Sequence, residues 1–504
     1  MLADRSDLLP DREPMRATGV AVSEFDGAPL VLVAGYGEAN RLFRGATGDA
    51  AGDGTAGLAD VAAELRDATA TGGDPYGEAE PVADPAGHAV GVAAADADAD
   101  GEEEWYVHNA GPFAREVLEP GADGGLGSPE PDQLLDPHGD DGLAGWLDLL
   151  ADGRNRRGRN LRVGRSVAAL DRTGDGTYAF LVTGDASPAR LQTVAAGSVT
   201  DRAPEVGIDF LGGGRSVVAG PARAVDTAGS AGCRMDLVLG MERGPNLLLR
   251  NDGGGFTDFA PELGVSDTHG DARGAALVDL GNALGLALGN DRGRNRLWDL
   301  RRGSPAGDVT PEPFAEPGPV RTVLAADLDN DGAQELFVTC HGAPNRLFRR
   351  VGPDHRDAAE WERVDPGAAA EPDIPTTGAV AADLDGDGAL ELFVAHGGPE
   401  GEPLSVYGHP DAADGWLRVR PLTRHGAPAR GALVTLDLDG GPHREQRRVV
   451  DAGSGYLCQG EPVAHFGLGD ATPRRVRVHW PDGETATAVE SPESDRVLDV
   501  PFPG

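Results

Sequence analysis

The stretch AADLDGDGALELFVAHGG, residues 381–398, decides the fold, and AADLDNDGAQELFVTCHG, residues 325–342, nearly duplicates it. A third copy, AAADADADGEEEWYVHN, covers residues 93–109. Each copy reads as the end of an apolar strand, a loop of alternating carboxylates with a glycine, and a second apolar strand. The sequence therefore predicts acidic loops that join consecutive β-strands.

The odd positions of these loops carry the candidate metal ligands. A hard cation such as Ca²⁺ prefers six to eight oxygen ligands, and the glycine after the third acid permits the positive φ of a tight turn. The candidates are Asp96, Asp98, Asp100, Glu102 and Glu104 in the first copy; Asp327, Asp329, Asp331, Ala333 and Glu335 in the second; and Asp383, Asp385, Asp387, Ala389 and Glu391 in the third. We therefore predict three Ca²⁺ sites.

The spacing excludes an EF-hand. That motif needs a glutamate at position twelve and a helix after it, whereas position twelve here is Val107, Val338 or Val394 within a strand-like run.

The loops also belong to a longer repeat. Its first loop positions are Val22, Asp96, Asp171, Asp226, Asp279, Asp327 and Asp383, and the later intervals of 48–56 residues suit one four-stranded propeller blade each.

The fold predicted from this repeat is all-β, a seven-bladed β-propeller over residues 1–412. Four of the seven loops are eroded; the third keeps Asp171, Thr173 and Asp175 as tentative ligands but has Ala179 at position nine. Two acidic, Gly/Pro-rich stretches, residues 69–87 and 119–142, read as solvated loop insertions. The N-terminal segment from Leu2 to Leu9 is expected to complete the last blade, because closure removes unpaired sheet edges.

Composition narrows the function classes. The chain has 504 residues, with 83 acidic residues against 44 basic ones, all arginine, and a formal charge of −39. This composition is typical of halophilic proteins and disfavours a nucleic-acid partner, since phosphate binding needs a basic surface. Three cysteines give neither a disulfide framework nor zinc spacing. No export signal and no apolar run long enough to span a membrane is visible, so the default expectation is a cytoplasmic protein, although export by another route stays open.

Two polar features allow more than one interpretation. The arginine run at residues 154–165 suits either an anionic ligand or ion pairing with neighbouring acidic loops. The recurring asparagines of the turn after the second strand are expected to be structural, because Asn caps turns. These are Asn40, Asn246, Asn295 and Asn345.

A different strand pattern begins near residue 414, and we read residues 414–500 as a small antiparallel β domain. Its marks are GAPARG (426–431), GSGY (453–456), HFGLG (465–469) and WPDG (480–483). These marks resemble the ASPIC/UnbV domain, and the repeats resemble the VCBS or FG-GAP-like repeat of propellers such as the integrin α-subunit head. The order of the two resembles the cartilage acidic protein family.

Two functions remain open from the sequence. The first is a non-catalytic, calcium-stabilised module that binds a protein or glycan partner, with no catalytic residue. The second is an enzyme that uses the central funnel of the propeller. His465 and His479 are candidate acid–base groups, but lone histidines in strand-rich sequence are more often structural. His341 and His396 occur at equivalent repeat positions, which favours a role in building the blades.

Overall fold

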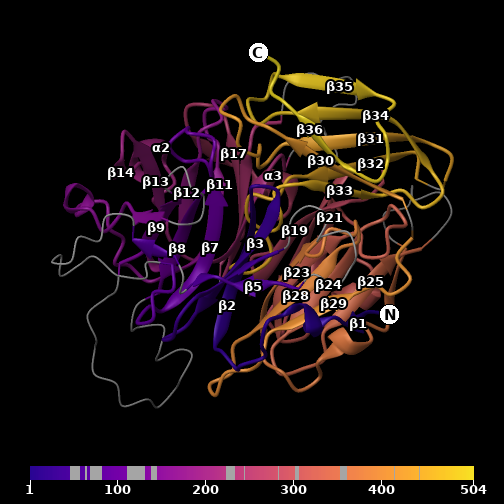
Figure 1. Ribbon diagram of the computed structural model, residues 1–504, viewed down its shortest axis with the longest axis horizontal. Coiled ribbons are helices and arrows are strands. Elements are labelled where there is room, and N and C mark those ends of the chain that lie inside the picture. The colour runs from indigo at the N-terminus through magenta and orange to yellow at the C-terminus, as the bar shows by residue number, and fades with distance from the viewer. Residues whose placement is uncertain are drawn as a thin grey trace.

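The computed structural model describes residues 1–45, 57–62, 65–67, 82–110, 131–137, 145–222, 233–242, 244–281, 283–300, 306–351, 360–413, 415–441 and 443–504. Within them almost all of the regular secondary structure is β-strand, which confirms the predicted all-β fold class. A curled arrangement of mainly antiparallel sheets forms the propeller, and the C-terminal strands lie against one end of it (Figure 1).

The propeller strands follow the repeat units. Units one and two contain β2 (Ala17–Phe25), β3 (Ala28–Gly35), β4 (Arg41–Arg44), β5 (Ala59–Asp60), β6 (Arg66–Asp67), β7 (Ala89–Ala95), β8 (Glu104–Asn109), β9 (Gln133–Pro137) and β10 (Gly145–Asp148). Units three and four contain β11 (Gly164–Leu170), β12 (Ala179–Pro188), β13 (Arg190–Ala195), β14 (Ser198–Asp201), β15 (Leu211–Gly220), β16 (Asp236–Met241), β17 (Leu247–Asn251) and β18 (Phe256–Asp258). Units five to seven contain β19 (Ala272–Asp279), β20 (Leu284–Asn290), β21 (Arg296–Asp299), β22 (Gly307–Asp308), β23 (Val320–Ala326), β24 (Glu335–Cys340), β25 (Arg346–Arg350), β26 (Trp361–Val364), β27 (Thr376–Ala382), β28 (Glu391–His396) and β29 (Ser405–Gly408).

Short helical turns connect some of these strands. They are η1 (Ser6–Leu8), η5 (Gly153–Asn155), α2 (Ala203–Val206), α3 (Ala260–Leu263), α4 (Glu312–Ala315) and η6 (Ala368–Ala370). The helices α2 and α3 share the sequence Ala-Pro-Glu and each ends at a glycine with positive φ, as a helix C-terminus commonly does. None of the helices in the described residues is long and apolar enough to cross a membrane.

The first strand of each unit lies nearest the propeller axis. The strands β2, β7, β11, β15, β19, β23 and β27 contact one another in this order, and β27 contacts β2 again, which closes the ring. They are rich in small apolar residues because neighbours cover both faces; all seven residues of β7 are buried. Gly91 shows how close the approach is, since a Cβ there would lie 2.2 Å from the Arg165 carbonyl oxygen.

The N-terminal segment completes the last sheet, as predicted from the sequence. Strand β1 (Ala3–Asp4) pairs antiparallel with β29, with Ala3 opposite Gly408. Leu2, Leu8 and Leu9 are buried beside it. In Figure 1 the N-terminus lies beside β29 accordingly.

The number of separate blades stays a prediction. Units three and four share one eight-stranded sheet, because β12 extends past its own unit and pairs with β15. Asp226, the predicted first loop position of unit four, lies outside the described residues.

The prediction of a solvated loop at 119–142 is wrong for residues 133–137. These form β9, which pairs with β8 and β10 and is fully buried. These five residues lie inside an acidic, proline-rich stretch, so their own sequence did not predict a strand. They form one because they pair with the neighbouring strands.

The C-terminal residues form two further sheets. They contain β30 (Trp416–Pro421), β31 (Leu433–Asp439), β32 (Glu445–Val449), β33 (Ala464–Gly467), β34 (Thr472–His479), β35 (Ala486–Glu490) and β36 (Val497–Val500). One sheet has the order β33-β30-β36 and the other β32-β31-β34-β35. Leu436, Phe466 and Trp480 lie in the apolar cluster between them. We call residues 415–504 the C-terminal part; a domain boundary at residues 412–414 stays a prediction.

The recurring asparagines are structural, as expected. In four units the asparagine Oδ1 accepts a hydrogen bond of 2.9 Å from the backbone N–H five residues earlier. The pairs are Gly35–Asn40, Met241–Asn246, Asn290–Asn295 and Cys340–Asn345. The same hydrogen bond thus fixes the turn between the second and third strands.

Candidate metal centres

Three acidic loops join the first and second strands of units two, six and seven, and each gathers carboxylates. In every case one oxygen from each of three acids lies within 4.8 Å of the others. The acids are those at loop positions one, three and nine: Asp96, Asp98 and Glu104; Asp327, Asp329 and Glu335; and Asp383, Asp385 and Glu391. The repeat spacing therefore brings these predicted ligands together.

The turn geometry explains the convergence. The glycine after the third acid has φ of 99°, 97° and 87° at Gly101, Gly332 and Gly388, which side-chain-bearing residues rarely adopt. The N–H of each glycine donates to the first acid of its loop, over 3.1–3.2 Å. The turn thus holds the first carboxylate in place.

The residues at positions five and seven play a different part. Asp100, Asp331 and Asp387 each accept a hydrogen bond from the N–H two residues on, which caps the turn. Asp331 and Asp387 lie outside the described carboxylate clusters, whereas Asp100 belongs to a second cluster with Glu104 and Asp136. The position-seven residues Glu102, Ala333 and Ala389 add no side chain to any described cluster.

The tentative ligands of unit three are not brought together. Both oxygens of Asp171 accept hydrogen bonds from turn amides, at Gly174, Asp175 and Gly176. Neither Thr173 nor Asp175 joins Asp171 in a cluster among the described residues. This loop keeps the turn of the motif without its ninth acid.

The clusters hold carboxylates that are costly to ionise without a counter-charge. Burial, with like charges nearby, raises the pKa of Asp96 to about 6 and that of Asp327 to about 7. The same causes raise the pKa values of Glu104, Glu335 and Glu391 well above the usual range.

Three buried oxygens in these clusters have no hydrogen-bond partner within the described residues. They are Glu104 Oε1, Asp327 Oδ1 and Glu335 Oε1. A buried, unpaired carboxylate oxygen is unfavourable, and a cation bound among the three acids of each loop would pair with it. The residues of units two and six therefore fit a metal ion.

In unit seven, two arginine side chains contact the acids of the cluster. Arg5 Nη2 donates to Asp385 Oδ2 at 2.7 Å and its Nη1 lies 3.6 Å from Glu391 Oε1. Arg418 of β30 donates to Asp383 Oδ2 at 3.0 Å. These two arginines therefore neutralise part of the negative charge of the cluster.

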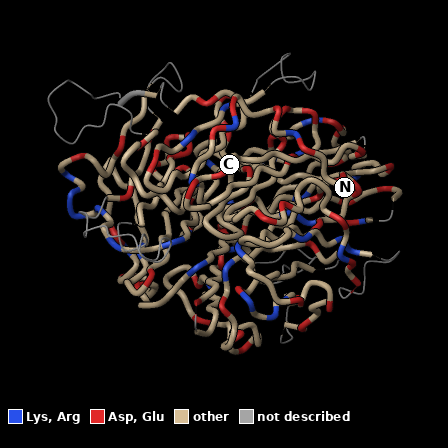
Figure 2. Tube along the Cα trace, turned by 90° about the horizontal axis from the view of Figure 1, so that it is seen from below, with Lys and Arg blue, Asp and Glu red and all other residues tan. Residues whose placement is uncertain are grey.

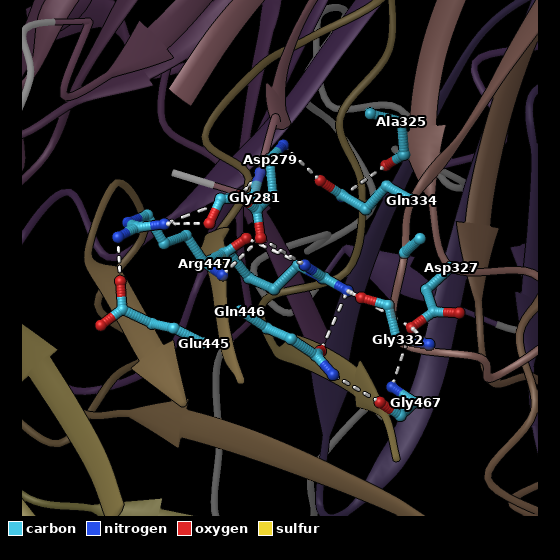
Figure 3. Close-up of polar contacts among 12 residues, drawn as sticks. Asp279, Gly281, Ala325, Asp327, Gly332, Gln334, Glu445, Gln446, Arg447 and Gly467 are labelled. Atoms are coloured by element: carbon cyan, nitrogen blue, oxygen red, sulfur yellow. Dashed lines mark hydrogen bonds and ion pairs between the residues drawn. The ribbon is translucent and has the colours of Figure 1, made fainter. Parts of the chain in front are cut away.

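The C-terminal part docks on the face that carries these loops. Arg448 contacts Asp327 of unit six at 3.3 Å and Asp279 of unit five at 3.6 Å. The Arg447 N–H donates to the same Asp279 oxygen, Oδ2, at 2.8 Å, and Gly467 N–H donates to Asp327 (Figure 3). Figure 3 shows both acids pointing towards the arginine-bearing strand β32.

Other units are held in the same way. Arg430 pairs with Glu103, Arg420 with Glu24, and His425 Nε2 lies 3.1 Å from the Asp175 carbonyl oxygen. At unit seven a Cβ on Gly388 would overlap the indole of Trp416. The acidic loops are therefore an internal interface as well as candidate metal centres.

A loop of the C-terminal part, residues 451–460, lies among the inner strands at this level. Gln459 bonds through its backbone to Val20 and Val22 and through its side-chain amide to Ala94. Gly455 exchanges two backbone hydrogen bonds with Ala275. The loop also bonds to Ala169 and Ala219, and it contacts Thr322 and Gly378 on the two remaining inner strands.

Four arginines at equivalent positions of β11, β15, β19 and β23 surround the tip of this loop. They are Arg165, Arg215, Arg273 and Arg321, and they alternate with Asp185, Glu242 and Asp291 in ion pairs. Burial would raise the pKa of Tyr456, but the four guanidinium groups outweigh it and lower the pKa. Only Arg165 belongs to a feature noted in the sequence, the arginine run at 154–165; the other three arginines were not predicted to form a ring.

The candidate histidines have structural partners. His396 Nε2 lies 3.0 Å from Glu371 Oε1, with both residues buried, and its Nδ1 lies 2.6 Å from the Pro403 carbonyl oxygen. His465 Nε2 lies 2.7 Å from Asn330 Oδ1 in the loop of unit six. His341 and His479 are partly buried, which lowers their pKa values.

The arginine run at 154–165 forms local contacts. Arg154 pairs with Asp152, Arg159 donates to the carbonyl oxygens of Leu150 and Ala151, and Arg165 pairs with Asp185. These contacts favour the ion-pairing interpretation. Acidic and basic segments are spread round the molecule (Figure 2).

Family models match two parts of the chain. The model described as ASPIC and UnbV matches residues 422–501, and the model of the FG-GAP-like repeat matches residues 327–394, which include the loops of units six and seven.

Solved structures are similar at a low level. The BP39L lectin from Burkholderia pseudomallei has 10% identity, a TM-score of 0.44, and coverage of 79% of this chain and 99% of its own. YCF48 from Cyanidioschyzon merolae has 12% identity, a TM-score of 0.43, and coverage of 80% and 98%. Likeness of this degree says nothing of function.

Sequence relatives are much closer. Cartilage acidic protein 1 of Homo sapiens is 36% identical over 516 residues, covering 96% of this chain and 72% of the relative. The protein of the same name from Mus musculus is 38% identical over 446 residues, covering 83% of this chain and 65% of the relative, so the chain spans just under two thirds of that protein.

This relationship corrects one expectation. The cartilage acidic protein 1 relatives are secreted extracellular proteins, so the default cytoplasmic location inferred from the sequence is wrong. The inference failed because it rested only on not recognising an export signal. With a matching repeat, a matching C-terminal family model and this identity over most of its length, the chain belongs to the cartilage acidic protein 1 family.

Proposed function

We propose that this protein is a non-catalytic, extracellular-type interaction module whose acidic loops bind Ca²⁺. The observation that carries the proposal is the set of buried carboxylate oxygens in the clusters of units two and six that have no hydrogen-bond partner among the described residues. A cation would pair with these oxygens and offset the repulsion among the acids.

The chemistry of the ligands supports calcium. The described clusters consist of carboxylates without histidine or cysteine, and hard oxygen ligands select Ca²⁺ or Mg²⁺ over zinc or copper. Mg²⁺ demands a near-ideal octahedron and gives up its water reluctantly, whereas Ca²⁺ tolerates irregular sets of ligands. A bound Ca²⁺ would supply structural charge neutralisation at each loop.

The position of the loops suggests what the cation stabilises. Asp327 faces both the candidate cation position and Arg448 of the C-terminal part. The loops thus connect the inner strands with the docked strands β30 and β32. Calcium bound here would hold the two sets of strands as one surface for a protein or glycan partner.

The loop among the inner strands favours a binding module over an enzyme of the central funnel. Residues 451–460 contact the inner strands of all seven units at the level of the acidic loops. These residues narrow the access of a substrate to the axis from this face. The outer surface remains for a partner.

Isothermal titration of chelator-treated protein with CaCl₂ tests the calcium proposal. Wild-type protein should bind Ca²⁺ and show a higher melting temperature in Ca²⁺ than in chelator, because a ligand at a hundred times its dissociation constant adds about 2.7 kcal/mol per site. Asp327→Asn should lose one site. The matched control is Asp171→Asn, the first acid of a loop that forms no cluster, which should lose none.

Absence of Ca²⁺ uptake by the wild type would refute the calcium proposal. The interaction role needs its own test, a pull-down from extracellular medium with and without chelator. Retention of the same protein only in the presence of Ca²⁺ would support it, and identical profiles from this protein and an unrelated acidic propeller would contradict it.

A further inference from the structure

The second carboxylate cluster of unit two goes beyond the repeat motif. Asp100, Glu104 and Asp136 each place an oxygen within 4.8 Å of the others, and Glu104 also belongs to the cluster with Asp96 and Asp98. Asp136 lies on β9, a strand outside the loop. It is 8% exposed, and Glu104 is fully buried.

From this arrangement we propose that Asp136 is an additional ligand of the unit-two site, which makes this site the tightest Ca²⁺ site of the three. The inference rests on the proposed function and adds a residue that the loop motif does not contain. Glu104 Oε1 is buried and has no hydrogen-bond partner in the described part of the chain, and its carboxylate belongs to both clusters.

The pairing of the strands explains why only unit two has this acid. Trp105 of β8 lies opposite Leu135 of β9, so the preceding Glu104 lies next to Asp136 across the sheet. The corresponding residues are Arg349 opposite Glu335 in unit six and Gly408 opposite Glu391 in unit seven. The third strand thus adds a negative charge in unit two, a positive charge in unit six and no side chain in unit seven.

Arginines from elsewhere in the chain extend this difference. Arg448 contacts the first acid of unit six, and Arg418 and Arg5 contact acids of unit seven. In the described part of the chain, no arginine forms an ion pair with Asp96, Asp98, Asp100 or Glu104. Since affinity for Ca²⁺ rises with the number of charged ligands, the order of affinity should be unit two, then six, then seven.

The test is titration of full-length, chelator-treated protein with CaCl₂ at fixed ionic strength. Asp136→Asn should weaken the tightest binding step by roughly tenfold or more and leave the weaker steps unchanged. Asp96→Asn should remove the same step. Asp136→Glu, which keeps a carboxylate, should retain it.

Asp299→Asn is the matched control. Asp299 is a buried acid at the same register of the third strand in unit five, opposite Gly285, where the loop lacks the carboxylate set. Its titration should superimpose on that of the wild type.

The outcomes separate the two proposals. A wild type that binds no Ca²⁺ would overturn the calcium proposal itself. A wild type that binds Ca²⁺, with Asp136→Asn titrating like Asp299→Asn, would overturn only the role of Asp136. Equal loss of binding in Asp136→Asn and Asp136→Glu, with a lower melting temperature of both in chelator, would show that Asp136 acts through packing and would also overturn it.

Discussion

Arg430 and Glu103 form a fully buried ion pair between the C-terminal part and the loop of unit two, 327 residues apart in sequence, with Arg430 Nε 2.5 Å from Glu103 Oε1. Arg430 also donates to the carbonyl oxygens of Val22, Asp451 and Gly460. One side chain therefore joins two propeller units and the loop of residues 451–460.

Replacing this arginine should be severely destabilising. Arg430→Gln leaves Glu103 buried without its counter-charge, which costs about 3–5 kcal/mol for a broken buried pair. Urea unfolding should show this loss. Glu103→Gln in the same chain should restore part of it, because the uncompensated charge is gone; a double variant no more stable than Arg430→Gln would contradict the ion-pair explanation.

Gly453 tests the loop on the axis. Its φ is 142°, and a Cβ there would lie 2.5 Å from Ala168 Cβ on β11. Gly453→Ala should cost about 1–3 kcal/mol through overpacking, measured by thermal unfolding. The control is Gly426→Ala, whose φ of 100° is also positive but whose Cβ would meet no atom of the described residues within 4 Å. Equal losses of stability in the two variants would mean that backbone strain, and not packing, causes the effect.

The stability of the calcium-free protein should depend on pH because of Asp327. Burial raises its pKa from 3.8 to about 7, so the folded state holds this proton more tightly than the unfolded state does. The free energy of unfolding should therefore fall as the pH rises from about 4 to about 7. Asp327→Asn should stabilise the calcium-free protein at pH 8, by on the order of 2–4 kcal/mol, and have little effect at pH 4.

In saturating Ca²⁺ at pH 8, Asp327→Asn should instead lower the free energy of unfolding, because the ionised carboxylate of the wild type then pairs with the cation. Chemical denaturation of wild type and variant at the two pH values, with chelator and with Ca²⁺, measures all four differences. Destabilisation by Asp327→Asn in chelator at pH 8 would contradict the raised pKa.

Deletion of residues 1–9 should weaken the last sheet. It removes β1 and the buried Leu2, Leu8 and Leu9, each of which contributes about 1.5–3 kcal/mol when fully buried. The melting temperature should drop clearly, whereas Asp7→Asn, on an exposed residue of the same segment, should leave it unchanged. A truncated chain as stable as the full one would show that β29 needs no partner.

Salt dependence tests the halophilic character predicted from composition. With a formal charge of −39, repulsion between acids should destabilise the fold at low ionic strength and be screened at molar salt. Circular dichroism should show loss of the β signal at low salt. Equal melting temperatures in 0.1 M and 2 M KCl, with Ca²⁺ held constant, would refute this prediction.

The repeat pattern predicted correctly those parts of the molecule in which residues close in sequence are also close in space. Acids spaced two apart, a glycine and an apolar strand specify a turn almost by themselves, so Asp383, Asp385 and Glu391 converge as their spacing predicted. The β1–β29 pairing was also predictable. The last unit lacks its final strand, and the N-terminal segment resembles the segments that end other units.

Contacts between distant segments could be decided only by the tertiary structure. Asp136 looked like part of a solvated insertion and lies beside Glu104 because β9 pairs with β8. The fifth-position acids looked equivalent to the others, yet Asp331 and Asp387 cap turns. Residues 451–460 lie where a propeller suggests an open funnel, and they contact the inner strands there.

The physical reason is the range of the interactions. A turn is fixed by backbone conformations and hydrogen bonds within a few residues, and these leave a pattern in the sequence. The charge that finally faces a carboxylate depends on which strand or loop packs against it. For Glu103, Asp327 and Asp383 that charge is an arginine between 35 and 327 residues away, which no local pattern can specify.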